Sequence, residues 1–157
     1  FRWRTLFHFP EIFTINYDLD SSSYCFTFII RDKVPAGCYN NLCKDMEAIW
    51  ESYCYFSKIE PARINIRKKY FSGLTRLDIY ITKDTLSSGE VNLVNSVIKE
   101  RFGENLISDY RVENFSLFKN HSPAEDDYLE YLLIQGEQNV KTLFAFRESG
   151  KVYVLNK

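Results

Sequence analysis

Two groups of charged residues are the strongest candidates for a functional surface in this 157-residue sequence. The first group is basic and surrounds one tyrosine; its members are Arg63, Arg67, Lys69, Arg76 and Tyr80. The second group is acidic and contains two tyrosines; its members are Glu125, Asp126, Asp127, Tyr128, Glu130 and Tyr131. Side chains of these kinds form ion pairs, hydrogen bonds and aromatic contacts, which indicates binding to a partner.

The basic group lies on a predicted β-hairpin. Residues 63–71 and 74–82 alternate between apolar and polar side chains on either side of Gly73, and this alternation is typical of two half-buried strands joined by a turn. Lys68 interrupts the alternation, which predicts a bulge or a strand end at that position. A solvated sheet face explains the basic side chains, because outward strand positions are normally polar. The alternative is a contact surface for RNA, for phosphate or for an acidic partner.

The acidic group lies at a predicted helix start. Ser122 can cap this helix, Pro123 suits its first position and Glu125 completes a capping box. A solvated helix start explains the acidic residues, because carboxylates stabilise the positive end of the helix dipole. The alternative is a docking patch for a basic protein, with the two tyrosines as anchors. Residues 128–134 fit a helix or a strand equally well.

The sequence holds no recognisable catalytic or metal-binding motif. Its four cysteines form no Cys-x2-Cys pair, it has only two histidines, and its six glycines form no phosphate-binding loop. We therefore predict no catalytic residue, no metal and no cofactor. The cysteines are expected to be free thiols in a reducing compartment. A Cys–His pair formed in space by Cys25 or Cys38 with His121 is the remaining catalytic alternative.

The composition is typical of a globular domain. Hydrophobic residues make up 45% and charged residues 26% of the chain, which excludes disordered and low-complexity classes. The 20 basic and 21 acidic residues leave a net charge of -1, whereas dedicated nucleic-acid-binding domains are usually basic. No apolar run is long enough to cross a membrane. With no secretory leader in the sequence, a cytoplasmic location is expected.

Periodicity along the chain predicts an α+β fold. Alternation predicts a first hairpin over residues 11–31 and a last one over 143–155. Helical spacing predicts one helix over 39–57 and a second from a capping box at Ser87 to a cap at Gly103. The predicted apolar stripe of the first helix consists of Leu42, Met46, Ile49, Trp50, Tyr53 and Phe56.

With a further strand expected at 110–118, these elements follow the order ββαββαβ. This order indicates a ferredoxin-like core, in which both helices cover one face of an antiparallel sheet. A C-terminal helix or strand and a β-hairpin would follow that core. We expect one domain over residues 1–157, or a core over 11–118 with a C-terminal unit over 122–157.

A chain rich in aromatic residues and without catalytic motifs is best interpreted as a binding module. Our first hypothesis is a non-enzymatic, cytoplasmic protein that binds a protein partner with a basic surface. An inhibitor or immunity protein that neutralises a basic toxin would be a concrete example. The alternatives are an RNA- or phosphate-binding accessory domain, a subunit of a larger assembly, and an enzyme whose site is assembled from distant residues.

Overall fold

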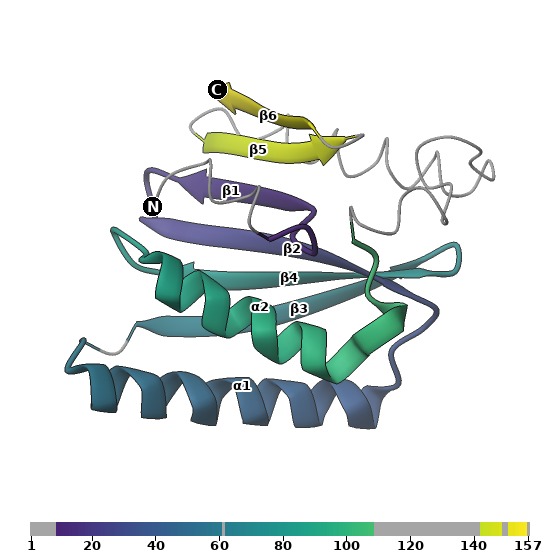
Figure 1. The fold of residues 1–157 in the computed structure, drawn as a ribbon, viewed down its shortest axis with the longest axis horizontal. Helices are drawn as coiled ribbons and strands as arrows, with labels where there is room; N and C mark the ends of the chain where they lie inside the picture. The colour runs from purple at the N-terminus through teal and green to yellow at the C-terminus, as the bar shows by residue number, and fades with distance from the viewer. Residues whose placement is uncertain (1–8, 61, 109–141, 149–150, 157) are drawn as a thin grey trace.

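Within the part of the chain that the structure describes, two helices form a layer against one antiparallel sheet. The computed structural model describes residues 9–60, 62–108, 142–148 and 151–156. Its elements are β1 (Thr14–Asp18), β2 (Ser23–Arg31), α1 (Ala36–Ser57), β3 (Arg63–Phe71), β4 (Leu74–Thr82), α2 (Ser88–Phe102), a 3-10 turn (Gly103–Asn105), β5 (Thr142–Glu148) and β6 (Lys151–Asn156). The strand order is β3-β4-β2-β1-β5-β6, and α1 and α2 lie on the same face (Figure 1). The predicted α+β class is therefore confirmed.

The predicted ferredoxin-like order is wrong in the strand beside β2. In that order β4 would pair with one edge of β2, and the strand expected at 110–118, after α2, would pair with the other edge. In the structure β1 pairs with this edge, and β5 pairs with β1. The pairing of β1 with β2 is local and needs only a short turn, so it forms at a small entropic cost of loop closure. After α2 the chain reaches the remaining part of the edge at Leu106, which forms a bridge with Ile30.

The last hairpin is confirmed, because β5 and β6 pair antiparallel and extend the same sheet. Two other predicted elements lie outside the described residues: the strand at 110–118 and the helix or strand beginning at Ser122. The division of the chain into one or two units therefore stays a prediction.

Strand β2 is central, and seven consecutive residues from Tyr24 to Ile30 are buried. This accounts for a sequence that is apolar on both faces of the strand. Alternate residues point toward the helices, where Phe26 and Phe28 pack in the main hydrophobic core. The core contains residues from β1 to α2, with Ile15, Leu77, Ile79, Val94 and Ile98 among the most buried.

Helix α1 confirms part of the predicted stripe, because Leu42, Met46 and Trp50 are buried and Tyr53 is partly buried against the core. Its buried residues follow at intervals of four and are Leu42, Met46, Trp50 and Cys54. Ile49 is 37% exposed and Phe56 is 81% exposed, so these two residues do not belong to the core. The sequence misleads because apolar residues stand on two sides of α1, and spacing alone cannot tell which side meets the sheet.

Two side chains of α1 hold the helix against the edge of the sheet. The hydroxyl of Tyr39 donates to the Ile66 carbonyl at 2.6 Å, and the indole N–H of Trp50 donates to the Ala62 carbonyl at 3.0 Å. Among the described strands, β3 is the last one on this side of the sheet. These bonds therefore satisfy backbone groups at an edge that could otherwise pair with another chain.

The hairpin of β3 and β4 has an uninterrupted register from Arg63 to Phe71. The prediction of a bulge or a strand end at Lys68 is wrong. Lys68 points toward the helices, where its ammonium donates to the Val34 carbonyl at 3.2 Å and lies 5.0 Å from the centre of the Tyr39 ring. A long side chain can place its charge at the margin of an apolar face, so one lysine does not end a strand. Gly73 has a φ of 84°, as its position in the turn requires.

Helix α2 begins with the predicted capping box. The Ser87 hydroxyl accepts the Glu90 N–H at 3.2 Å, and the Glu90 carboxylate accepts the Ser87 N–H at 3.3 Å. Glu90 is buried and pairs with Lys83 at 2.7 Å. Gly103 is the C-cap with a positive φ of 52°, as predicted, but its ψ of -121° lies outside the left-handed helical region.

Replacing Ser87 with alanine is expected to lower the free energy of unfolding by about 1 kcal/mol, because the cap hydrogen bond is lost. Urea unfolding at constant pH measures this change. Ser88→Ala is the matched control, since Ser88 is the first residue of the helix and does not cap it. Equal stability of the two variants would show that the cap contributes nothing.

Candidate functional site

The structure places the basic group on the face of the sheet opposite the helices. In the register of β3 with β4, Arg63 lies opposite Thr82, Arg67 opposite Asp78 and Lys69 opposite Arg76. Residues opposite one another share a face of the sheet. Their neighbours Ile66 and Ile79 pack in the core on the helix side, so these side chains point away from it. We call this surface the basic sheet face and define it by Arg63, Arg67, Lys69, Arg76 and Tyr80.

Arg76 is neutralised within the basic sheet face. Its Nε lies 2.8 Å from the Asp78 carboxylate, which also accepts a hydrogen bond of 2.7 Å from the Thr27 hydroxyl. Both members of the Arg76–Asp78 pair are largely buried. In contrast, Arg63, Arg67 and Lys69 are exposed along β3. The accessible positive charge of this surface therefore lies on β3.

Tyr80 is not an open aromatic platform. The guanidinium of Arg67 lies 5.2 Å from the centre of the Tyr80 ring, in the geometry of a cation–π contact. Burial raises the pKa of Tyr80, and the neighbouring Cys25 and Asp78 raise it further. The Tyr80 ring thus packs between the sheet and the Arg67 guanidinium.

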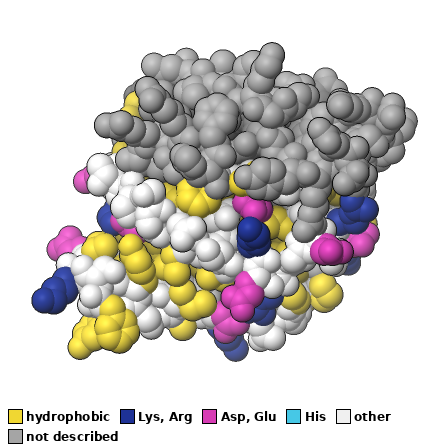
Figure 2. Space-filling view, in the orientation of Figure 1, with side chains coloured by type: hydrophobic (Ala, Val, Ile, Leu, Met, Phe, Trp, Pro, Cys, Tyr) yellow, Lys and Arg dark blue, Asp and Glu magenta, His cyan; other side chains and the backbone are white. Residues whose placement is uncertain are grey.

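A second surface, which the sequence did not reveal, lies on the exposed side of α1. Tyr55 is 80% exposed and Phe56 is 81% exposed, and their rings meet edge to face with centres 5.4 Å apart. Figure 2 shows hydrophobic side chains gathered over the C-terminal end of α1, at the lower left. Ile49 stands two turns before Phe56 on the same side of the helix. The sequence pattern assigned Ile49 and Phe56 to the core, which is why it missed this surface.

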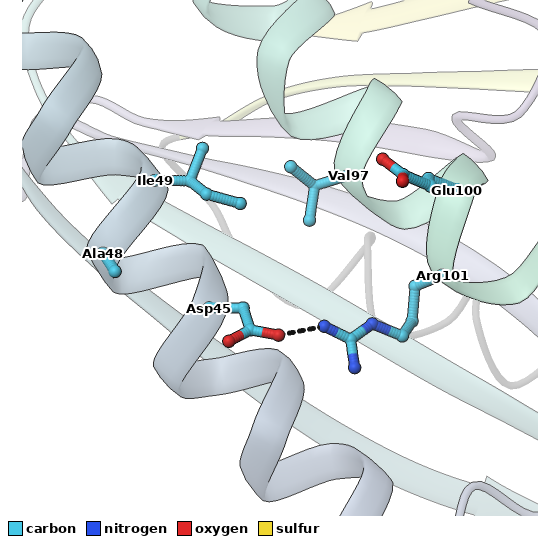
Figure 3. Close-up of a pocket in the computed structure, with 6 residues that line it drawn as sticks. All are labelled: Asp45, Ala48, Ile49, Val97, Glu100 and Arg101. Atoms are coloured by element: carbon cyan, nitrogen blue, oxygen red, sulfur yellow. Dashed lines mark hydrogen bonds and ion pairs between the residues drawn. The ribbon is translucent and has the colours of Figure 1, made fainter.

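A groove between α1 and α2 includes Ile49 in its lining. Its volume is about 490 Å³, and it is lined by Asp45, Ala48, Ile49, Val97, Glu100 and Arg101. Ile49 and Val97 face one another across the groove, and an ion pair between Asp45 and Arg101 spans its other end (Figure 3). We call Ile49, Tyr55, Phe56 and Val97, together with this groove, the helix surface.

The two surfaces differ in charge. Residues 44–60, which include most of α1, hold four carboxylates and two lysines, a net charge of -2. Residues 63–82, which form the hairpin, hold five basic residues and one acidic residue, a net charge of +4. Glu47 and Glu51 are exposed and precede Tyr55 at intervals of four residues, so the three share one side of α1. Helix α1 and the β3–β4 hairpin therefore carry net charges of opposite sign.

Comparison with family models, with curated proteins and with solved structures finds no match. We therefore infer function from the geometry of the described residues. Among these residues, no helix is long and apolar enough to cross a membrane.

The four cysteines all lie within the described residues. All four cysteines are free, as expected; Cys25 and Cys54 are buried, and Cys38 and Cys43 are half-buried. Burial, with a contribution from Asp78, raises the pKa of Cys25 to about 12. This thiol stays protonated at neutral pH and is a poor nucleophile. His121 lies outside the described residues, so its pairing with a cysteine is untested.

Two further sequence predictions concern metal binding and the acidic group. Within the described residues, no three side chains of His, Cys, Asp or Glu are placed to hold a metal ion together. The acidic group, from Glu125 to Tyr131, lies outside the described residues and stays a prediction.

Proposed function

We propose that this protein is a binding module that docks a basic protein partner through the helix surface. The observation that carries the proposal is the exposure of Tyr55 and Phe56, two adjacent aromatic side chains of which about four fifths is open to water. Neither ring contributes to the core, and exposed aromatic clusters commonly mark sites of protein association. Tyrosine is also among the residues that dominate binding energy at interfaces.

The helix surface offers a partner a considerable apolar area. A large aromatic side chain can bury roughly 150 to 250 Å² of surface. At about 25 cal/mol per Å², each ring could contribute a few kcal/mol before the costs of association are subtracted. The groove beside Ile49 and Val97 would receive an apolar side chain of the partner. Tyr55 and Phe56 would then act as the anchors and the groove as the adjoining pocket.

Charge favours a basic partner. Glu47 and Glu51 lie in line with Tyr55, and Glu100 lines the groove. Carboxylates at the rim of an interface attract an oppositely charged protein and raise its rate of association. An inhibitor or immunity protein that neutralises a basic toxin is one concrete form of this function, and a subunit of a larger assembly is another.

The test begins with capture of partners from the native host by the unmodified full chain. The captured partner is then measured against full chains that carry Tyr55→Ala or Phe56→Ala. Each variant is expected to bind the captured basic partner at least tenfold more weakly than the unmodified protein, as truncated anchor residues do. Surface plasmon resonance with the purified partner measures the change. Leu19→Ala is the matched control, because Leu19 is also exposed but lies at the end of the β1–β2 hairpin.

Two results would contradict the proposal. One is a partner that binds both aromatic variants as tightly as it binds the unmodified protein. The other is self-association that the aromatic variants abolish, since the helix surface would then join two copies of this chain. The predicted acidic docking patch has its own test: reversing the charges of Asp126 and Asp127 should weaken the same complex if that patch contributes.

A further inference from the structure

We propose that the basic sheet face binds the phosphate backbone of a single-stranded nucleic acid. This site is separate from the helix surface and does not depend on the function proposed for it. The observation behind it is the row of arginine and lysine side chains on β3. Because Lys68 lies on the helix side, the sheet face of the hairpin carries four basic residues and one acidic residue, a net charge of +3 within a chain of net charge -1. Such a concentration of charge on one face suits a polyanion.

The arrangement of the cations suits an extended strand. Arg67 and Lys69 are two residues apart on β3, which corresponds to about 7 Å along a β-strand, and Arg63 lies two such steps before Arg67. Charges in a line along a flat sheet match a chain of phosphates better than one compact anion. Sheet faces are a common platform for single-stranded RNA and DNA.

The local contacts prepare Arg67 for this role. Its guanidinium lies over the Tyr80 ring, so the side chain is held in place before any ligand arrives. A guanidinium can bind phosphate oxygens through two parallel hydrogen bonds, which a lysine cannot do. The Asp78 carboxylate would repel phosphate, but Arg76 and Thr27 already engage it.

Protection of the sheet edge explains the basic residues on β3 less completely than phosphate binding does. Charged residues on an edge strand do discourage pairing with another chain. However, the hydrogen bonds of Tyr39 and Trp50 already cover carbonyls on this side of the hairpin. Edge protection also requires no particular sign of charge, whereas Asp78 is the single acidic residue between 63 and 82.

The contacts also predict the manner of binding. Because Arg67 covers the Tyr80 ring, bases would not stack on Tyr80, and recognition would depend on phosphate contacts. Binding should therefore depend weakly on base sequence and strongly on salt. Three phosphate contacts on a single strand give a slope of about -2 in a plot of log K against log salt.

Fluorescence anisotropy with the full chain and a labelled oligouridylate of about 12 nucleotides tests the proposal. Between about 50 and 200 mM NaCl the affinity should fall about fifteenfold. The double variant Arg63→Gln/Arg67→Gln should bind at least tenfold more weakly at the lower salt and should reduce the slope to about -0.7. Lys33→Gln/Lys44→Gln is the matched control, because it removes two exposed cations outside this face. Circular dichroism establishes that each variant is folded.

Three outcomes would overturn the proposal. The first is a dissociation constant weaker than about 100 µM at low salt, the weak limit of non-specific nucleic-acid binding. The second is an equal loss of affinity in the control variant, which would show diffuse attraction without a site. The third is tight binding of an oligoglutamate peptide without binding of the oligouridylate, which would assign the surface to an acidic protein.

Discussion

Replacing Trp50 with alanine is expected to lower the free energy of unfolding by about 3 to 5 kcal/mol. Trp50 is 1% exposed and packs in the core between α1 and the sheet. Truncation removes the transfer free energy of a large ring and leaves a cavity that the surrounding side chains fill only in part. It also removes the donor to the Ala62 carbonyl. Urea unfolding with comparison of the m-values measures the change.

The control for this prediction is Phe56→Ala in the same helix. Phe56 is 81% exposed, so its removal is expected to change the free energy of unfolding by less than about 0.5 kcal/mol. Trp50→Phe keeps an aromatic ring but loses the indole N–H, and it should fall between the two alanine variants. A loss of several kcal/mol in Phe56→Ala would place that ring in the core and would remove the basis of the helix surface.

The contrast between Trp50 and Phe56 also shows what the sequence can predict. Both residues fit one apolar stripe at helical spacing, and the helix itself was correctly predicted from that spacing. Which residues of the helix meet the sheet depends on how α1 rotates against β3. That rotation is set by contacts such as the Tyr39 hydroxyl with the Ile66 carbonyl, which join residues 27 positions apart in the sequence. Local periodicity carries no information about them.

The same distinction holds for the sheet. The hairpins and the α2 capping box were predicted because each depends on neighbouring residues, such as Ser87 with Glu90. The pairing of β1 with β2 was predicted as a hairpin, but the strand order was not, because the ferredoxin-like order assigned the same edge of β2 to the strand expected at 110–118. The N-terminal strand pairs along Thr14–Asp18, and the segment after α2 reaches only Ile29 and Ile30 within the described residues.

The basic sheet face was predicted in composition but not in detail. Side chains alternate between the two faces of a β-strand, and this period of two residues was enough to place Arg63 and Arg67 on one face. It could not show that Asp78 neutralises Arg76 or that Arg67 covers Tyr80, because these contacts depend on the register of β3 against β4. The register thus determines which of the predicted residues remain accessible to a ligand.

Alkaline conditions are expected to destabilise the protein, and Cys25 alone should lower the free energy of unfolding by about 3 kcal/mol between pH 9 and pH 12. Burial raises the pKa of this thiol from its ordinary value of 9.0 to about 12 in the folded state, with a further contribution from Asp78. The unfolded chain therefore loses the thiol proton at lower pH than the folded chain does. The stabilisation is fully present below pH 9 and is lost as the pH rises toward 12.

Urea unfolding at several pH values in this range measures the decline. Cys25→Ala removes the titrating group, so the free energy of unfolding of this variant should fall less steeply with pH than that of the unmodified protein. The difference between the two slopes should be about 1.4 kcal/mol per pH unit over the middle of the range. Ile30→Val is the matched control, because it destabilises the same strand by about 1 kcal/mol and keeps the thiol. An equally steep decline in Cys25→Ala would assign the effect to other groups. Tyr80→Phe would then test the second buried group, because burial also raises the pKa of the Tyr80 hydroxyl. This variant keeps the ring that contacts the Arg67 guanidinium on the basic sheet face.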